Sequence, residues 1–102
     1  MLRGEVWWVE FARAVGSEIR KTQPGVIVSI KYANRNLSRL VVVPLTSNTD
    51  GLYRGEANVP VAGRESKAMA DQLTTASKVR LRSKIDMLPK ADLLAVELAI
   101  RV

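Results

Sequence analysis

The 102-residue chain contains neither cysteine nor histidine. Without cysteine it can form no disulfide and use no thiolate as a nucleophile. Without histidine it lacks the commonest zinc ligand and the usual base of a serine triad or of an acid and base pair that hydrolyses RNA. We therefore expect no metal and no other cofactor.

Long apolar runs are also missing. None approaches the roughly 20 residues that a membrane-spanning helix needs. The opening residues Met1 to Glu5 lead directly into strand-like sequence, without the apolar core and cleavage site of a secretory signal. These features predict a cytoplasmic protein that does not associate with a membrane.

Positive charge is in excess. Sixteen Lys and Arg residues stand against ten Asp and Glu residues, which gives a net charge of +6. A field of this sign attracts polyanions such as nucleic acids, although a similar charge also serves solubility alone. The length suits one domain, which we expect to comprise residues 1–102.

Short apolar segments separated by turn-forming residues predict a mainly-β fold. Residues 6–11 are aromatic and β-branched, residues 26–30 follow a polar loop that closes at Pro24, and residues 40–46 form a run covered on both faces. Pro44 cannot donate to a ladder and should lie at an edge or near the strand end. Residues 31–38 read as a connection.

The second half continues this pattern and ends in a helix. After a turn cluster at residues 46–51, short segments at 57–61, 68–72 and 75–81 predict further strands of a small barrel. Beyond Pro89, apolar residues recur at helical spacing to the C-terminus. This helix should pack on the barrel and keep apolar surface for a second subunit.

The residue types that remain favour chemistry on RNA. Hydroxyls, carboxylates and many cations suit a phosphodiester whose nucleophile, the ribose 2′-hydroxyl, already belongs to the substrate. The protein then needs only to orient that hydroxyl and to stabilise the charge that develops on the phosphate.

Four short motifs occur in order along the chain. They are Arg3-Gly4-Glu5-Val6-Trp7, Gly16-Ser17-Glu18 ahead of a basic loop and Pro24, Val43-Pro44-Leu45-Thr46, and Ala70-Asp71-Gln72. Together they resemble the MazF/PemK toxins of type II toxin-antitoxin systems. The resemblance implies an SH3-like barrel of the CcdB/MazF/PemK type that forms a homodimer. It also implies a metal-independent, sequence-selective endoribonuclease that leaves a 2′,3′-cyclic phosphate and a 5′-hydroxyl on single-stranded RNA and is inhibited by an acidic antitoxin.

The resemblance also implies site residues. Thr46 and Glu18 are the expected catalytic residues, and Arg20, Lys21, Ser47 and Gln72 are expected to bind RNA. Gln23 stands where the family has an Arg, so a neutral amide replaces a charged fork that grips phosphate at two points. Three interpretations of Gln23 remain open. Arg20 or Lys21 substitutes for the missing Arg, the protein is a weak or purely binding relative, or the chain is a deliberately inactivated variant.

Several of these residues have a simpler structural interpretation. Thr46 could cap a turn, Glu18 could pair with a neighbouring cation, and Gln72 could form a structural hydrogen bond. Lys78, Arg80, Arg82 and Lys84 alternate along one strand-like segment and so should project to a common face, which is either a phosphate track or a solvated edge. Trp7 and Trp8 must point to opposite faces of their strand, so we expect one in the core and one at a surface.

Two alternative functions remain open. The chain could keep the RNA groove and the antitoxin surface and yet be catalytically silent because of Gln23. It could instead resemble the CcdB toxins, which share the barrel and inhibit gyrase through a Trp-Gly-Ile terminus. The sequence Ala99-Ile100-Arg101-Val102 argues against that second alternative.

Overall fold

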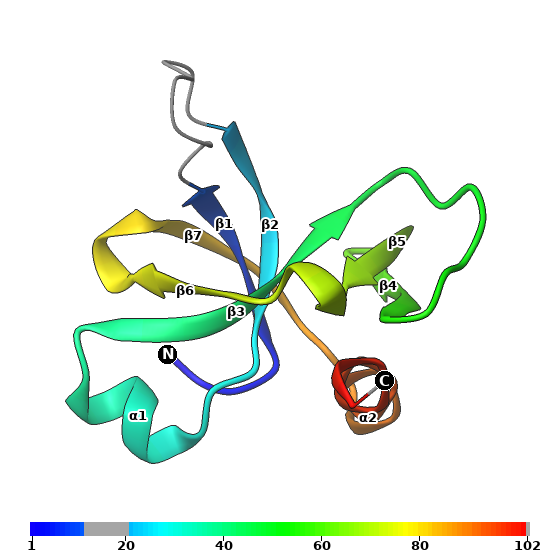
Figure 1. Cartoon of the computed structure of the whole chain (residues 1–102). Coiled ribbons are helices and arrows are strands. Elements are labelled where there is room, and N and C mark those ends of the chain that lie inside the picture. The colour runs from blue at the N-terminus through cyan, green and yellow to red at the C-terminus, as the bar shows by residue number, and fades with distance from the viewer. Residues whose placement is uncertain (12–20, 102) are drawn as a thin grey trace.

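A computed structural model describes residues 1–11 and 21–101 of the chain (Figure 1). The strands are β1 (Glu5–Phe11), β2 (Lys21–Ile27), β3 (Arg39–Thr46), β4 (Glu56–Val61), β5 (Arg64–Met69), β6 (Thr74–Ser77) and β7 (Leu81–Met87). The helices are α1 (Lys31–Asn36) and α2 (Lys90–Ile100), and the 3₁₀ turns are η1 (Ala70–Gln72) and η2 (Lys78–Arg80). The predicted mainly-β fold with a C-terminal helix is confirmed.

The strands form one antiparallel sheet in the order β4-β5-β3-β2-β1-β7, and β6 also pairs with β3. The sheet curls so that its two ends meet. At the tip of the β4–β5 hairpin, the Ala62 N–H donates a 2.7 Å hydrogen bond to Asp86 of β7. Such curling is what a small barrel requires.

One edge of β3 carries an interrupted ladder. Leu45 pairs with Ala68 of β5, whereas Val42 pairs with Thr74 of β6. Between these two pairs β3 advances three residues and the facing chain advances six, because η1 is inserted as an excursion. Pro44, which has no amide hydrogen to donate, lies within the gap, in agreement with its predicted place near the strand end.

Alternate side chains of the central strands supply two apolar clusters. Val43 and Leu45 of β3 pack in a cluster that includes Val96 of α2, while Leu40 and Val42 pack in a second cluster on the other face. Burying each such side chain contributes about 1.5–3 kcal/mol. The prediction that this strand is covered on both faces is confirmed.

Helix α2 contacts β4 and η1, below the β4–β5 hairpin in Figure 1. Val96 and Ala99 are buried against the sheet, whereas Leu94 and Leu98 are 53% and 54% exposed. The expectation that this helix keeps apolar surface is therefore confirmed.

The β2 and α1 regions differ from the sequence prediction. The strand that we expected at 26–30 already begins at Lys21 and ends at Ile27, so Pro24 lies inside it. Pro24 is tolerated because β2 pairs with β3 only from Gly25 onward. The connection predicted at 31–38 contains the short helix α1.

The four alternating cations do not share one strand. Lys78 and Arg80 lie in η2, and only Arg82 and Lys84 lie in β7. Arg80 and Arg82 pair with Glu10 of β1, and the Lys84 ammonium lies 3.2 Å from Glu5. The prediction of one common cationic face was wrong because turn η2 interrupts the alternation, and these carboxylates partly neutralise the cations.

Buried or bonded carboxylates make the stability of the fold depend on pH. Burial raises the pKa of Glu5, but hydrogen bonds from Trp7 and the backbone, together with Lys84, lower it further than burial raises it. The backbone amides of Ala62 and Met87 hold the pKa of Asp86 below its ordinary value. Both groups bind fewer protons in the folded chain than in the unfolded chain.

We predict that these two carboxylates contribute their full stabilisation at neutral pH. The free energy of unfolding should fall as the pH drops below about 4, because the unfolded chain then binds more protons than the folded chain. Urea denaturation at pH 7 and pH 3 measures this difference. Asp86→Asn should reduce the dependence, whereas Glu65→Gln, at an exposed residue of the β4–β5 hairpin, should not. A dependence unchanged by Asp86→Asn would contradict the assignment.

Candidate functional site

Two adjoining hollows open where β3 ends. They share Trp8, Pro24, Leu45, Thr46 and Ser47. The one that we call the polar hollow has a volume of about 480 Å³ and is completed by Thr22, Gln23, Met69 and Gln72. The apolar hollow, of about 420 Å³, is completed by Val61, Ala62, Arg64, Glu65, Ser66 and Ile85.

The bend in the sheet brings the walls of the polar hollow together. Thr46 is the last residue of β3, Gln72 is the last residue of η1, and Gln23 lies in β2. Thr46, Ser47 and Gln72, which the sequence singled out, therefore line one hollow. Glu18 and Arg20 lie outside the described residues.

Lys21 is described only through its backbone, which opens β2 opposite Phe11. The predicted cations Arg20 and Lys21 are adjacent in the sequence. Lys21 is the first residue of β2, the strand that supplies Gln23 to the polar hollow.

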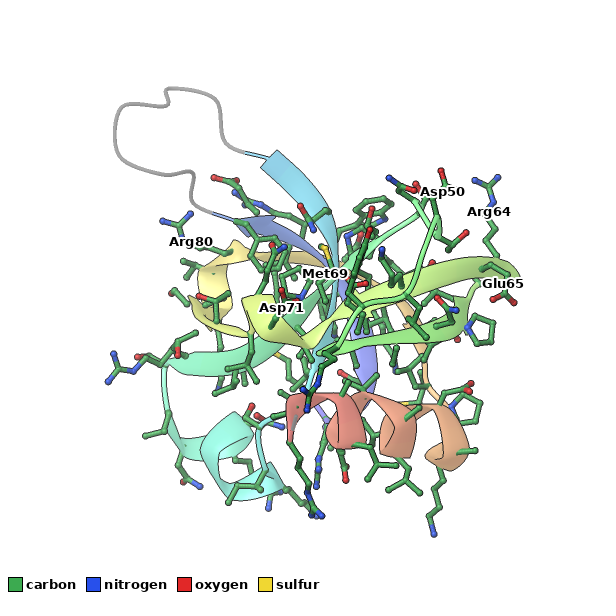
Figure 2. All side chains as sticks on the ribbon, turned by 45° about the vertical axis from the view of Figure 1, so that its right-hand side comes forward. Asp50, Arg64, Glu65, Met69, Asp71 and Arg80 are labelled. Atoms are coloured by element: carbon green, nitrogen blue, oxygen red, sulfur yellow. The ribbon has the colours of Figure 1, made fainter. Side chains whose placement is uncertain are left out.

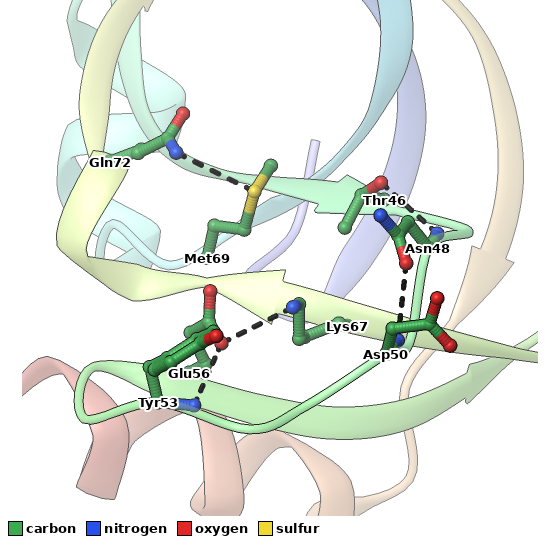
Figure 3. A network of polar contacts seen from close by, with 8 residues as sticks. All are labelled: Thr46, Asn48, Asp50, Tyr53, Glu56, Lys67, Met69 and Gln72. Atoms are coloured by element: carbon green, nitrogen blue, oxygen red, sulfur yellow. Dashed lines mark hydrogen bonds and ion pairs between the residues drawn. The ribbon is translucent and has the colours of Figure 1, made fainter.

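Thr46 is held by the turn that follows it. Its Oγ1 accepts the Asn48 N–H at 3.2 Å, and the Asn48 side-chain oxygen accepts the Asp50 N–H at 3.1 Å (Figure 3). Because the oxygen acts as an acceptor in this bond, the hydroxyl hydrogen of Thr46 can still donate to a ligand. The predicted capping role is therefore real and leaves the hydroxyl usable.

Gln23 reaches the same place from β2. Its Nε2 donates a 3.3 Å hydrogen bond to the carbonyl of Leu45, the residue before Thr46. A side chain at position 23 therefore ends beside Thr46. In this chain it brings an amide dipole there and no charge.

Gln72 and Met69 form the opposite wall. Gln72 is exposed, and its Nε2 lies 3.6 Å from the Met69 sulfur (Figure 3). A thioether is a weak acceptor, so this amide can exchange its partner for a ligand at little cost.

Trp8 lines both hollows and is 42% exposed. Trp7 points the other way, packs against the second apolar cluster and donates to Glu5 at 3.0 Å. This confirms the predicted division between the two tryptophans. An exposed aromatic ring at the junction of two hollows can stack on an unpaired base.

The two hollows differ in the charge of their walls. The described side chains that line the polar hollow are uncharged, whereas Arg64 and Glu65 line the apolar hollow, far from Arg80 (Figure 2). Over residues 1–11 and 21–101, no three carboxylates lie close enough together to hold a metal ion. No helix in that part of the chain is long and apolar enough to cross a membrane.

The loop after β3 is tied to η1. The Gly55 carbonyl accepts the Asp71 N–H at 3.1 Å, and Gly55 has a φ of +80°. A Cβ atom added at Gly55 would lie 3.1 Å from that of Asp71. Asp71, the residue before Gln72, thus depends on a glycine that lies 16 residues earlier in the sequence, on the other side of the β4–β5 hairpin.

The sequence matches one family of known proteins over almost its whole length. The sequence model described as PemK-like, MazF-like toxin of type II toxin-antitoxin system matches residues 2–102. Endoribonuclease MazF9 of Mycobacterium tuberculosis is 32% identical over 111 residues, which cover 100% of this chain and 94% of that protein.

Solved structures share the fold. MazF from Deinococcus radiodurans superposes with a TM-score of 0.82 at 22% identity, covering 98% of this chain and 92% of that one. A mycobacterial endoribonuclease in complex with its cognate antitoxin gives a TM-score of 0.80 at 22% identity, covering 98% and 90%.

We predict that Gly55→Ala destabilises the chain more than Gly63→Ala. Both glycines have a φ near +80°, but an added Cβ meets Asp71 at Gly55 and no atom within 4 Å at Gly63. The shared backbone strain costs about 1–2 kcal/mol in each variant, and only Gly55→Ala adds crowding against η1. Urea denaturation of both variants measures the difference, and equal losses would contradict the close approach.

Proposed function

This chain belongs to the family of PemK-like, MazF-like toxins of type II toxin-antitoxin systems, and we propose that it binds and cleaves single-stranded RNA in the polar hollow without a metal ion. The observation that carries the proposal is the convergence of Thr46, Gln23 and Gln72 from three elements on one hollow beside an exposed tryptophan.

In the proposed reaction, the ribose 2′-oxygen attacks the adjacent phosphorus and the bond from phosphorus to the 5′-oxygen breaks. The 2′-hydroxyl loses a proton and the leaving 5′-oxygen gains one, so the products are a 2′,3′-cyclic phosphate and a 5′-hydroxyl. Thr46 donates its hydroxyl hydrogen to a phosphate oxygen, which stabilises the charge that develops there. Glu18 assists the proton transfer.

Gln23 limits the rate of this reaction. Its amide ends beside Thr46, where a guanidinium would meet the phosphate with two charged donors. Removing one well-placed donor to a developing oxyanion typically costs on the order of a hundredfold or more in rate. We propose that Arg20 and Lys21 supply the positive charge, because Lys21 is the first residue of β2 and Arg20 precedes it in the sequence.

RNA binding follows from the same walls. Trp8 stacks on an unpaired base between the two hollows, Gln72 and Ser47 donate to base edges or phosphates, and Arg20 and Lys21 bind the phosphate backbone. We propose that the protein acts in the cytoplasm, because its proposed substrate is found there.

An antitoxin is the proposed protein partner. Some of the structural neighbours are complexes of MazF with MazE or of an endoribonuclease with its cognate antitoxin. A net charge of +6 favours an acidic, extended segment that covers the RNA hollow and keeps this chain inactive.

We also propose a homodimer. Ile30, Leu73 and Ile100 come from three separate segments, are all exposed, and surround one hollow together with Arg3 and Val41. The apolar surface that these residues form lies outside the proposed RNA site, so a partner subunit can cover it without blocking the substrate.

We predict metal-free cleavage that depends on Thr46 and increases with Gln23→Arg. A long unstructured RNA is incubated with EDTA and with the chain, Thr46→Val or Gln23→Arg, and the product ends are identified. Thr46→Val keeps the shape of the side chain and removes its hydroxyl, so the rate should fall at least tenfold. Gln23→Arg should raise the rate at least tenfold.

The outcomes separate the alternatives. Cleavage only by Gln23→Arg means that this chain is a catalytically silent relative that retains the fold and the hollow. Cleavage that survives Thr46→Val, or that EDTA abolishes, contradicts the proposed mechanism. If neither the chain nor Gln23→Arg cleaves RNA, the proposed function is wrong.

The dimer is tested separately by sedimentation velocity. Ile30 is 60% exposed, and Ile30→Glu should convert the dimer to a monomer because the carboxylate would be buried without a partner. Val79 is 77% exposed in η2, and Val79→Glu should leave the dimer intact. A dimer that is insensitive to Ile30→Glu would exclude this surface as the interface.

A further inference from the structure

Lys67 is a buried cation close to the proposed catalytic strand. It is 6% exposed, and among the side chains that the structure describes it is the one buried lysine or arginine. In the sheet it lies directly opposite Thr46 of β3, and its neighbour on the other side is Asn58 of β4. Directly opposed residues of antiparallel strands project to the same face of the sheet.

The Lys67 ammonium is engaged by the end of the loop that follows Thr46. It lies 3.3 Å from the Glu56 carboxylate and 5.9 Å from the centre of the Tyr53 ring. The same Glu56 oxygen accepts the Tyr53 N–H at 2.9 Å, as Figure 3 shows. The Tyr53 amide and Lys67 lower the pKa of Glu56 despite its burial, so Glu56 is a carboxylate at neutral pH.

This pair fastens a loop that has few other anchors. Residues 47–54 are all exposed, so little apolar burial fixes their course. At the start of the loop, Thr46 Oγ1 holds the Asn48 amide, and at the end, Glu56 holds the Tyr53 amide. Gly55 then holds the Asp71 amide of η1. The loop therefore connects the Thr46 and Gln72 walls of the polar hollow.

Removing one partner of such a pair leaves a buried charge without compensation. The Lys67 ammonium would then compete for Tyr53, for loop carbonyls or for water, and the loop would lose its fixed end. Removing both charges together is milder, because no unpaired charge remains.

We infer that Lys67 and Glu56 are positioning residues that hold the loop 47–55 and thereby fix Thr46 and Ser47 at the RNA hollow. Neither residue needs to touch the substrate. The effect on RNA rests on the proposed function, whereas the effect on the loop does not.

The loop is tested first in the protein without RNA. NMR measures the hydrogen-exchange rates of individual backbone amides. We expect the Tyr53 and Asn48 amides to exchange at least tenfold faster in Lys67→Met and Glu56→Gln, while amides of β1 and β2 keep their rates. Lys67→Arg should restore slow exchange, and the double variant should lie between the chain and the single variants. Unchanged exchange at Tyr53 in both single variants overturns the inference.

RNA cleavage is then measured with the same substitutions. They are made in the chain itself if it cleaves RNA, and otherwise in Gln23→Arg. Lys67→Met should lower kcat/KM about tenfold, mainly through kcat, since misplacing a reacting group by about 1 Å can cost a hundredfold. Lys67→Arg should recover most of the activity, and Lys90→Met, which removes an exposed lysine from the start of α2, should change it less than twofold.

The two measurements fail separately. Faster loop exchange with unchanged kcat/KM overturns the positioning of the site, although the loop anchor would remain. Cleavage by neither the chain nor Gln23→Arg refutes the proposed function and the effect on RNA with it, while the exchange rates still decide whether Lys67 and Glu56 hold the loop.

Discussion

The arrangement of this protein depends on the interruption of the hydrogen-bonded ladder along one edge of β3. The facing chain uses three more residues than β3 to pass this point, and η1 absorbs them. The excursion turns the Gln72 side of the chain toward the end of β3, and the polar hollow forms between them. The loop from Thr46 to Glu56 then returns to η1 through Gly55. A fully paired β3 would have no place for this excursion.

Much of the fold could be predicted because it is written in local sequence. Strands β1 and β3 follow from short apolar runs, and α2 follows from apolar residues at helical spacing after Pro89. The early start of β2 could not be predicted, since Pro24 is acceptable only because β3 pairs with β2 further along. Strand pairing of this kind joins residues that are distant in the sequence, and composition does not report it.

The site divides in the same way. Thr46, Ser47 and Gln72 were predicted from a resemblance, and the structure brings them to one hollow. Trp8 and Met69 were not recognised as lining residues, although the alternation of Trp7 and Trp8 already required one exposed ring. Lys67 gave no signal, because its burial and its place opposite Thr46 arise only from the pairing of β5 with β3.

Fewer cations are available to bind RNA than the net charge of +6 suggests. Arg80 of η2 and Arg82 and Lys84 of β7 have carboxylate partners on β1, and Lys67 is engaged by Glu56. The described side chains that line the polar hollow are neutral, so positive charge for RNA must come from other parts of the chain. This distribution makes the neutral amide of Gln23 consequential, since it ends where a phosphate would be held.

The account is tested most directly by mapping amide chemical shifts while a single-stranded RNA that carries 2′-deoxy sugars, and so cannot be cleaved, is added to the chain. This titration is independent of whether Gln23 leaves any activity. The account predicts that the largest changes occur at Trp8, Gln23, Thr46, Ser47 and Gln72. Changes confined to Arg82, Lys84 and the rest of β7, or no changes at all, would contradict it.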